Sequence, residues 1–117
     1  KITFKKGTGD TPDDFYVAYI DPQSRQLKLA SYVVTFPTMR KGRPVEQLDQ
    51  HAIVFQEWQQ ADGLLVPKQA QFYKWVNENI EGEPLGKLEF SNVHFSKAQP
   101  DPAKFRKPDG AVIAPLP

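Results

Sequence analysis

Apolar and polar residues alternate along residues 51–77 and predict a long β-hairpin at the centre of the fold. Two strand-like runs meet at Asp62 and Gly63, a pair that suits a tight type I′ turn because both residues tolerate a positive φ. If these two residues form the whole turn, Ala61 lies opposite Leu64. The same register places Glu57 opposite Lys68, Phe55 opposite Ala70, Ile53 opposite Phe72 and His51 opposite Lys74.

This register sorts the hairpin side chains onto two faces that both carry large apolar groups. One predicted face holds Ile53, Phe55, Val66, Ala70, Phe72 and Val76. The other holds Gln56, Trp58, Gln69, Gln71, Tyr73 and Trp75. A three-residue turn would bring the apolar residues of the first strand opposite glutamines, so we favour the shorter turn.

The residues before the hairpin predict three further strands, at residues 1–6, 14–21 and 27–36. Pairing Asp21 with Gln26 across the second turn sets their faces. It puts Ala18, Ile20, Leu27 and Leu29 on one face and Phe15, Val17, Tyr19, Ala30 and Tyr32 on the other. Because both faces are apolar, we expect something to cover each side of the sheet.

The residues after the hairpin predict a turn at 81–86 and a last strand at 87–97. A bulge near Ser91 and Asn92 would bend this strand and gather its apolar side chains on one face. Those side chains are Leu88, Phe90, Val93 and Phe95. Such a bend suits a sheet that curls.

The tail then loses the alternating pattern. Asp101 can cap a short helical turn, and Pro102 suits its first position. Phe105 is the large apolar residue of this turn, and we expect it to dock at the sheet edge. Residues 110–117 could add a final short strand or an extended arm. Together, these elements predict one all-β domain over residues 1–117: a curved, half-barrel-like antiparallel meander of about six strands, with a short helical turn near the C-terminus.

Composition agrees with a single folded domain: the chain has 117 residues, of which 39% are hydrophobic and 14 are aromatic (2 Trp, 4 Tyr and 8 Phe). The net charge of +1, from 15 basic and 14 acidic residues, gives no electrostatic reason to expect nucleic acid or an anionic membrane as partner. The absence of cysteine excludes disulfides and thiolate metal sites. No run has the length of a transmembrane helix and no signal peptide is visible. Because the chain starts at Lys1, we expect it to be a processed or excised piece.

The sequence contains no nucleophile elbow and no spacing typical of a general base, which predicts a protein that is not an enzyme and uses no cofactor. Its two histidines are His51 and His94, and Asp49 would share a face with His51. These groups could begin a metal site, but nothing fixes their geometry, so we predict none. Asp13 and Asp14 lie in a loop and are interpreted as solubilising charges.

Two other features bear on possible partners. The basic segment 37–47 contains two prolines and predicts a solvated loop, with binding of a partner as the alternative. Aromatic residues on alternating strands could stack on single-stranded nucleic acid. Acidic residues and glutamines are interspersed among them, so we do not favour that class of partner.

A resemblance to a known family rests on three segments: DDFYVAYIDPQSRQLKLASYVVTF, DGLLVPKQAQFY and LEFSNVHFSKAQPDPAKFRKPDGA. They cover most of residues 10–111. They look like the C-terminal half of an uncharacterised family of bacterial envelope proteins, whose architecture is similar to the half-barrel of lipoprotein carriers. The resemblance implies a curved sheet around an apolar hollow that helices close as a lid. This chain has no segment able to form those helices, so a second copy or further sequence should cover its inner face.

These observations lead to two hypotheses that stay open at the level of sequence. The first is a non-enzymatic periplasmic or secreted domain that binds a hydrophobic ligand, such as a lipid, or an acylated protein in the concave face of the half-barrel. Its expected inner surface consists of Tyr32, Ile53, Phe55, Phe72 and Phe90, with Trp58, Tyr73 and Trp75 outside or at the rim. The second is an interaction module whose second apolar face associates with another copy to form a homodimer.

Overall fold

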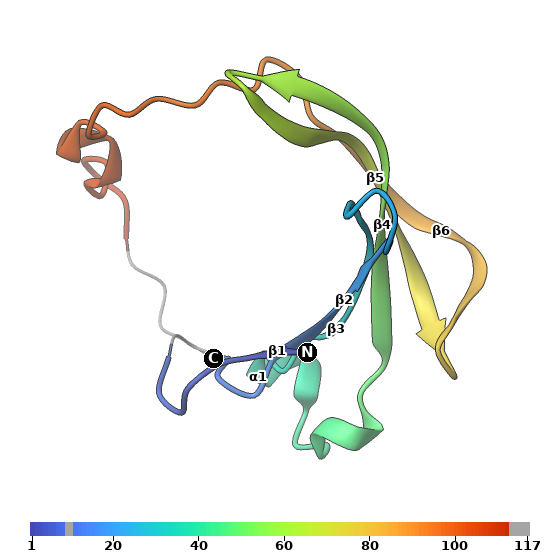
Figure 1. Cartoon of the computed structure of the whole chain (residues 1–117). Helices are drawn as coiled ribbons and strands as arrows, with labels where there is room; N and C mark the ends of the chain where they lie inside the picture. The colour runs from blue at the N-terminus through green and yellow to red at the C-terminus, as the bar shows by residue number, and fades with distance from the viewer. Residues whose placement is uncertain (9–10, 113–117) are drawn as a thin grey trace.

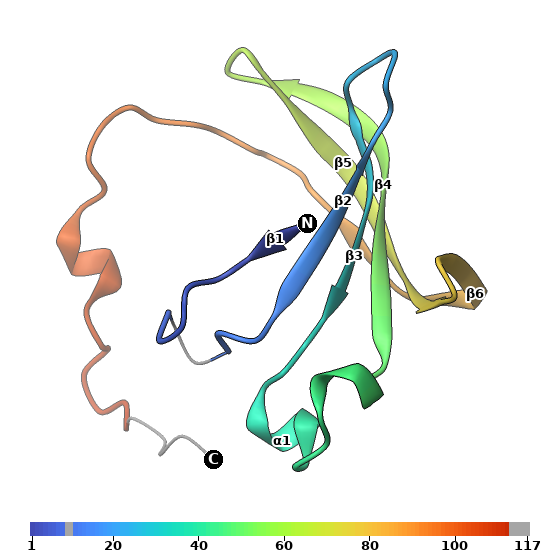
Figure 2. The same ribbon diagram turned by 60° about the horizontal axis from the view of Figure 1, so that its bottom comes forward.

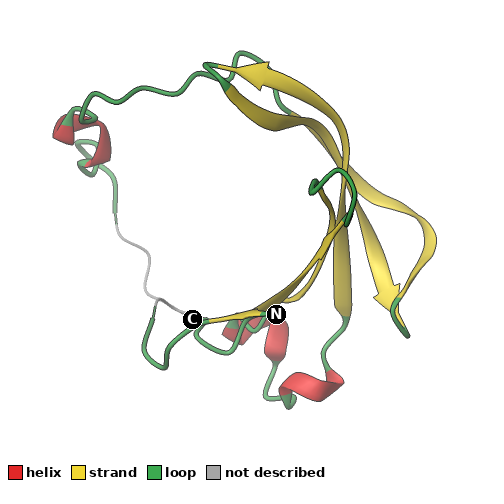
Figure 3. Cartoon of the chain, viewed as in Figure 1, coloured by secondary structure: helices red, strands yellow, loops and turns green. Residues whose placement is uncertain are grey.

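The chain forms one six-stranded antiparallel sheet with little helix (Figure 1). The computed structural model describes residues 1–8 and 11–112. The strands of this part of the chain are β1 (Ile2–Thr3), β2 (Phe15–Ile20), β3 (Leu27–Val33), β4 (Gln50–Ala61), β5 (Leu64–Val76) and β6 (Asn79–Glu89). Three short helical segments, drawn in red in Figure 3, are α1 (Pro37–Arg40), η1 (Val45–Gln47) and η2 (Pro102–Phe105).

Each strand pairs with its neighbours in chain order, so the sheet is a meander with β1 and β6 at its edges (Figure 2). The predicted all-β antiparallel meander of six strands is therefore confirmed. The sheet is neither closed nor strongly curled, and the curvature of a half-barrel is not reached. The segment 37–47, expected as a loop, contains α1 and η1.

The β4–β5 hairpin has the register that the alternating pattern predicts. Ala61 lies opposite Leu64, and the pairs Phe55–Ala70, Ile53–Phe72 and His51–Lys74 follow. Asp62 (φ 47°) and Gly63 (φ 83°) both adopt the left-handed conformation that a type I′ turn requires. Glu57 lies near Lys68 as expected, but its φ of 43° interrupts the regular strand.

The pairing of β2 with β3 differs from the prediction by one residue. The backbone N–H of Asp21 donates to the carbonyl of Gln26, as expected. The register then shifts between Tyr19 and Ile20, so that Tyr19 lies opposite Leu29. Such a bulge moves every following side chain of one strand relative to the other strand. The predicted faces of this pair are therefore wrong: Ala30 and Tyr32 lie on the side opposite Tyr19.

The last strand also begins earlier than predicted. Asn77 (φ 48°) and Glu78 (φ 60°) form a two-residue turn, and β6 starts at Asn79, opposite Val76. The predicted turn at 81–86 is therefore part of β6, and the predicted bulged strand at 87–97 is wrong beyond Glu89, where β6 ends. β5 is 13 residues long, and β6 pairs with its free edge immediately after this turn. Proline is tolerated in β6 because this strand lies at the edge of the sheet.

The sheet has two faces, which we name after one central residue each. The Ile53 face carries Tyr16, Ala18, Ala30, Tyr32, His51, Ile53, Phe55, Ala70, Phe72, Lys74 and Leu88. The Trp75 face carries Phe15, Val17, Tyr19, Leu29, Ser31, Val33, Gln50, Ala52, Val54, Gln71, Tyr73, Trp75 and Ile80.

The buried residues concentrate on the Trp75 face. Val33, Ser31 and Ala52 are 1%, 2% and 0% exposed, and Trp75 is 9% exposed. Trp75, expected outside or at the rim of the inner surface, lies on the face opposite Ile53 and is buried there. On the opposite face most large side chains are half-buried, Lys74 and Leu88 are exposed, and only the small Ala70 is fully covered.

The molecule exposes more surface than a compact protein of its size. Its accessible area is 9395 Å², whereas a globular protein of this mass exposes about 6,400 Å². Its radius of gyration is 17.4 Å, against about 13 Å for a compact domain of this length. The described residues thus form a single layer, without the cover on each face that the sequence led us to expect (Figures 1 and 2).

The tail contains the helical turn that the sequence predicts. The side chain of Asp101 accepts a hydrogen bond of 2.9 Å from the backbone N–H of Ala103, and Pro102 occupies the first position. Phe105 is 77% exposed, so its predicted docking at the sheet edge is wrong. The final strand or arm expected at 110–117 falls largely outside the described residues.

Candidate functional site

An aromatic row crosses the Ile53 face from β1 to β4. The rings of Phe4 and Tyr16 meet edge to face at 6.2 Å. Tyr16 stacks on Tyr32 at 5.8 Å, and the Tyr32 ring lies 5.9 Å from the His51 ring. These contacts arise because the three strand residues lie directly opposite one another in adjacent pairs. Burial, and to a smaller extent the neighbouring Tyr16, raises the pKa of Tyr32 above its ordinary value.

Four of the predicted ligand-binding residues lie together on the Ile53 face. Ile53 is directly opposite Phe72, Phe55 is two residues along the same strand, and Tyr32 is on the neighbouring strand. All four are half-buried. The backbone N–H of Phe90 donates to the carbonyl of Lys68, which extends the β5–β6 pairing and places Phe90 beside the same surface, 36% exposed.

The Ile53 face is an open surface at these residues. The four pockets that we describe are lined by other residues, and none includes Tyr32, Ile53, Phe55 or Phe72. None of these four pockets therefore provides a cavity for a ligand at these residues. The residues that sequence reasoning selected are brought together, but on a surface of a different shape from the one expected.

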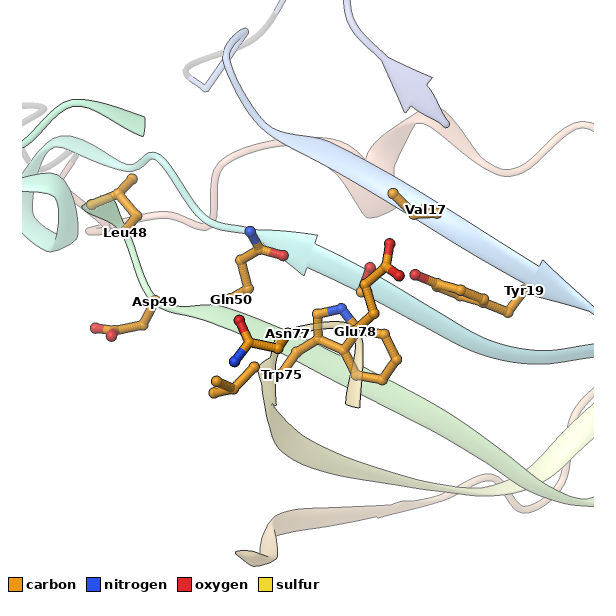
Figure 4. A pocket seen from close by; sticks show the side chains of 10 residues that line it. Val17, Tyr19, Leu48, Asp49, Gln50, Trp75, Asn77 and Glu78 are labelled. Atoms are coloured by element: carbon orange, nitrogen blue, oxygen red, sulfur yellow. The ribbon is translucent and has the colours of Figure 1, made fainter. Parts of the chain in front are cut away.

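A pocket of about 480 Å³ opens on the Trp75 face (Figure 4). Its lining residues are Val17, Tyr19, Ser31, Leu48, Asp49, Gln50, Trp75, Val76, Asn77 and Glu78. The rings of Tyr19 and Trp75 lie 5.5 Å apart at an interplanar angle of 60°. Since β2 and β5 are about 14 Å apart across two intervening strands, both rings lean inward over the small side chains of Ser31 and Ala52.

This pocket combines an aromatic wall with acidic groups. Asp49 and Glu78 contribute carboxylates, and no basic residue lines it. Figure 4 shows Glu78 beside the rings of Tyr19 and Trp75. Sequence reasoning missed the pocket, since the one-residue shift after Tyr19 and the turn at Glu78 both escape the alternating pattern. The signal that could have found it is the row of small residues, Ser31 and Ala52, beside the row of the large Trp75.

The candidate catalytic and metal-ligating groups do not form a site. His51 stacks on Tyr32, whereas the Nδ1 atom of His94 lies 3.5 Å from the Asp62 carboxylate and its side chain is 82% exposed. Asp49 is 4.0 Å from Arg43. Among residues 1–8 and 11–112, no group of three histidine or carboxylate side chains could hold a metal ion, and no helix is long and apolar enough to cross a membrane.

Comparisons with known proteins add no family assignment: no family model, curated protein or solved structure matches this chain. The resemblance to bacterial envelope proteins with a lipoprotein-carrier architecture thus stays a prediction from the sequence. What the structure defines is the class of fold, an open antiparallel β-meander with two apolar faces.

Proposed function

We propose that this chain is a non-enzymatic binding domain that holds a hydrophobic ligand, or the acyl chain of a modified partner, against its Ile53 face. The observation that supports the proposal is the gathering of half-buried aromatic and branched side chains on one uncovered sheet face. Its location in the periplasm or outside the cell is part of the proposal and rests on the resemblance alone. The proposal requires neither a metal nor another cofactor.

The arrangement of the Ile53 face suits an extended apolar ligand. Ala18 and Ala30 lie in the same cross-strand row as Ile53 and Phe72, beside the row of Tyr16 and Tyr32. An extended apolar chain that lies across these two rows would cover their side chains, and each Å² of apolar area covered contributes about 25 cal/mol. Ligand binding would therefore stabilise the sheet by burying apolar side chains that the uncovered Ile53 face leaves in contact with water.

In this proposal, the half-barrel is the shape that the sheet adopts when a ligand is bound. Register shifts interrupt β2 at Tyr19 and β5 near Phe72, and the positive φ of Glu57 interrupts β4. Bulges and similar irregularities are the positions at which sheets bend. We propose that the sheet curls at these points when a ligand fills its Ile53 face.

The proposal is tested by extracting the purified protein with organic solvent and searching for lipid by mass spectrometry, together with titration of a fluorescent fatty acid. Ile53→Gln and Val54→Gln form a matched pair, since these neighbours point to opposite faces and both are half-buried. We expect Ile53→Gln to weaken fatty-acid binding about tenfold, the effect of roughly 1.4 kcal/mol, and Val54→Gln to leave it nearly unchanged. Absence of extracted lipid together with no fatty-acid binding, or equal loss in both variants, would contradict the proposal.

A second candidate function is self-association through the Ile53 face, in an interaction module. The excess of exposed area over that of a compact protein favours it, because the difference of about 3,000 Å² exceeds the roughly 800 Å² that each partner buries in a standard interface. Sedimentation velocity separates the candidates. A dimer that Ile53→Gln dissociates, without bound lipid, would support self-association, whereas a lipid-loaded monomer would exclude it.

A further inference from the structure

We propose that the pocket on the Trp75 face binds the C-terminal arm of a second copy of this chain, with Phe105 inserted beside Tyr19 and Trp75. The C-terminal arm comprises residues 98–112. This inference does not depend on lipid binding, since it uses the face opposite Ile53.

The arm projects from the sheet and carries exposed apolar groups. The hydrogen bonds that the structure shows for its residues all join neighbours within the tail. Phe105 is 77% and Val112 is 90% exposed. In Figures 1 and 2 the arm leaves the end of the β4–β5 hairpin and runs apart from the strands. An exposed phenylalanine on such a segment gains free energy by burial against a partner.

The charges of the arm complement those of the pocket. Phe105 is flanked by Lys104, Arg106 and Lys107, which gives three basic residues within four positions. The pocket presents the carboxylate of Glu78 beside its aromatic wall, whereas Asp49 lies at the other end of the pocket, 4.0 Å from Arg43 (Figure 4). An aromatic ring with basic neighbours therefore finds both the apolar surface and the opposite charge that it needs in one place. The pocket volume of about 480 Å³ is ample for one phenylalanine side chain.

The arm of the same molecule does not fill this pocket. None of its residues lines the pocket, and Phe105 is 77% exposed. Asp62 fixes the start of the tail beside the β4–β5 turn, because its carboxylate accepts a hydrogen bond of 2.7 Å from the backbone N–H of Phe95. Trp75 lies at the opposite end of β5, next to the turn at Asn77 and Glu78. The pocket thus stays open in the single chain, and a second copy supplies the arm.

The first test measures the dimerisation constant by sedimentation equilibrium for the full chain and two phenylalanine variants. Phe105→Ala removes two buried rings per dimer and is expected to weaken association about 100-fold. Phe95→Ala is the matched control, since Phe95 is 48% exposed but precedes the arm, and its effect should stay below about threefold. A monomeric wild-type protein, or equal weakening by both variants, would overturn the inference.

The second test exchanges charges between the arm and the pocket. Glu78→Lys and Lys104→Glu should each weaken association when studied alone, because each creates a like-charge contact. An equimolar mixture of the two variants should restore it, since every arm–pocket contact in the mixed dimer pairs opposite charges. Both positions are exposed in the monomer, so circular dichroism should show the fold intact. Failure of the mixture to recover would overturn arm exchange, and a dimer that persists without Phe105 would support only the sheet-face association considered above.

Discussion

Asp14 holds Thr35 through two hydrogen bonds to one carboxylate oxygen. Its Oδ1 atom accepts from the backbone N–H and from the hydroxyl of Thr35, each at 2.6 Å, and Thr35 is 5% exposed. The contact joins the residue before β2 to the chain that follows β3, 21 positions later. The interpretation of Asp14 as a solubilising surface charge is therefore wrong, because its carboxylate serves buried donors.

This contact leads to the first prediction. Asp14→Ala should lower the free energy of unfolding by about 1–3 kcal/mol, because it leaves a buried N–H and a buried hydroxyl without their acceptor. Asp13→Ala is the matched control: its ion pair with Arg40, at 2.9 Å, is exposed and should cost less than about 1 kcal/mol. Urea unfolding of both variants measures the difference. Equal losses would show that the two hydrogen bonds contribute no more than a surface ion pair.

The second prediction concerns the backbone of Glu57. A side chain at its φ of 43° costs about 1–2 kcal/mol, and glycine avoids this penalty. Glu57→Gly loses the exposed ion pair with Lys68, at 3.0 Å, which is worth about 0–1 kcal/mol. We therefore expect Glu57→Gly to remain within about 1 kcal/mol of the wild-type stability, and Glu57→Val to be less stable than the glycine variant.

The comparison is informative because valine is among the best residues for regular strands. In a strand interior with ordinary geometry, valine would be the more stable substitution. Urea unfolding of the glycine and valine variants therefore reports on the local backbone. A valine variant as stable as the glycine variant would mean that residue 57 is not held at a positive φ.

The parts of the fold that could be predicted are those in which a periodic pattern and a turn agree. At Asp62 and Gly63 the turn residues fix the register, and the alternation on both sides confirms it, so the hairpin was predicted pair by pair. The failures lie at single residues. The register shifts at a bulge after Tyr19, and the chain turns at Asn77 and Glu78, which include no glycine. Neither feature interrupts the pattern of apolar and polar residues, so the pattern does not reveal them.

The candidate sites follow the same division. Ile53 and Phe72 were placed correctly beside each other because they belong to the well-specified hairpin. The pocket depends on Tyr19 and Trp75, which two intervening strands separate, so its prediction needed the correct register of β2, β3, β4 and β5 together. An error of one residue in β2 turns Tyr19 to the other face, which is why the pocket escaped prediction.

The third prediction concerns pH. The pKa of Tyr32 is raised above its ordinary value of 10.0, chiefly because burial disfavours the phenolate and also because Tyr16 lies nearby. Since the folded-state pKa is the higher one, the contribution of Tyr32 to stability is complete below pH 10 and is lost as the pH rises through the folded-state pKa. Tyrosinate absorbance should therefore show a late-titrating tyrosine that Tyr32→Phe removes.

Tyr16→Phe serves as the partner variant in this titration. It removes the smaller cause and leaves the larger one, so the pKa of Tyr32 should fall only part of the way toward its ordinary value. If Tyr16→Phe removed the late tyrosinate absorbance step and Tyr32→Phe did not, the late-titrating residue would be Tyr16. Tyr32 would then not be the buried member of the aromatic row.

The last prediction uses two glycines in different conformations. A Cβ atom at Gly86 would meet the Cδ2 atom of Phe72 at 3.8 Å, an ordinary van der Waals contact, and its backbone lies outside the left-handed region. Gly86→Ala should therefore stabilise the protein by about 0.4–1 kcal/mol, because alanine restricts the unfolded chain. Gly63→Ala provides the contrast: with a φ of 83° in the β4–β5 turn, it should destabilise the protein by about 1 kcal/mol or more. Thermal and urea unfolding of both variants measure the two signs, and a destabilised Gly86→Ala would show that β6 packs against Phe72 more tightly than this contact implies.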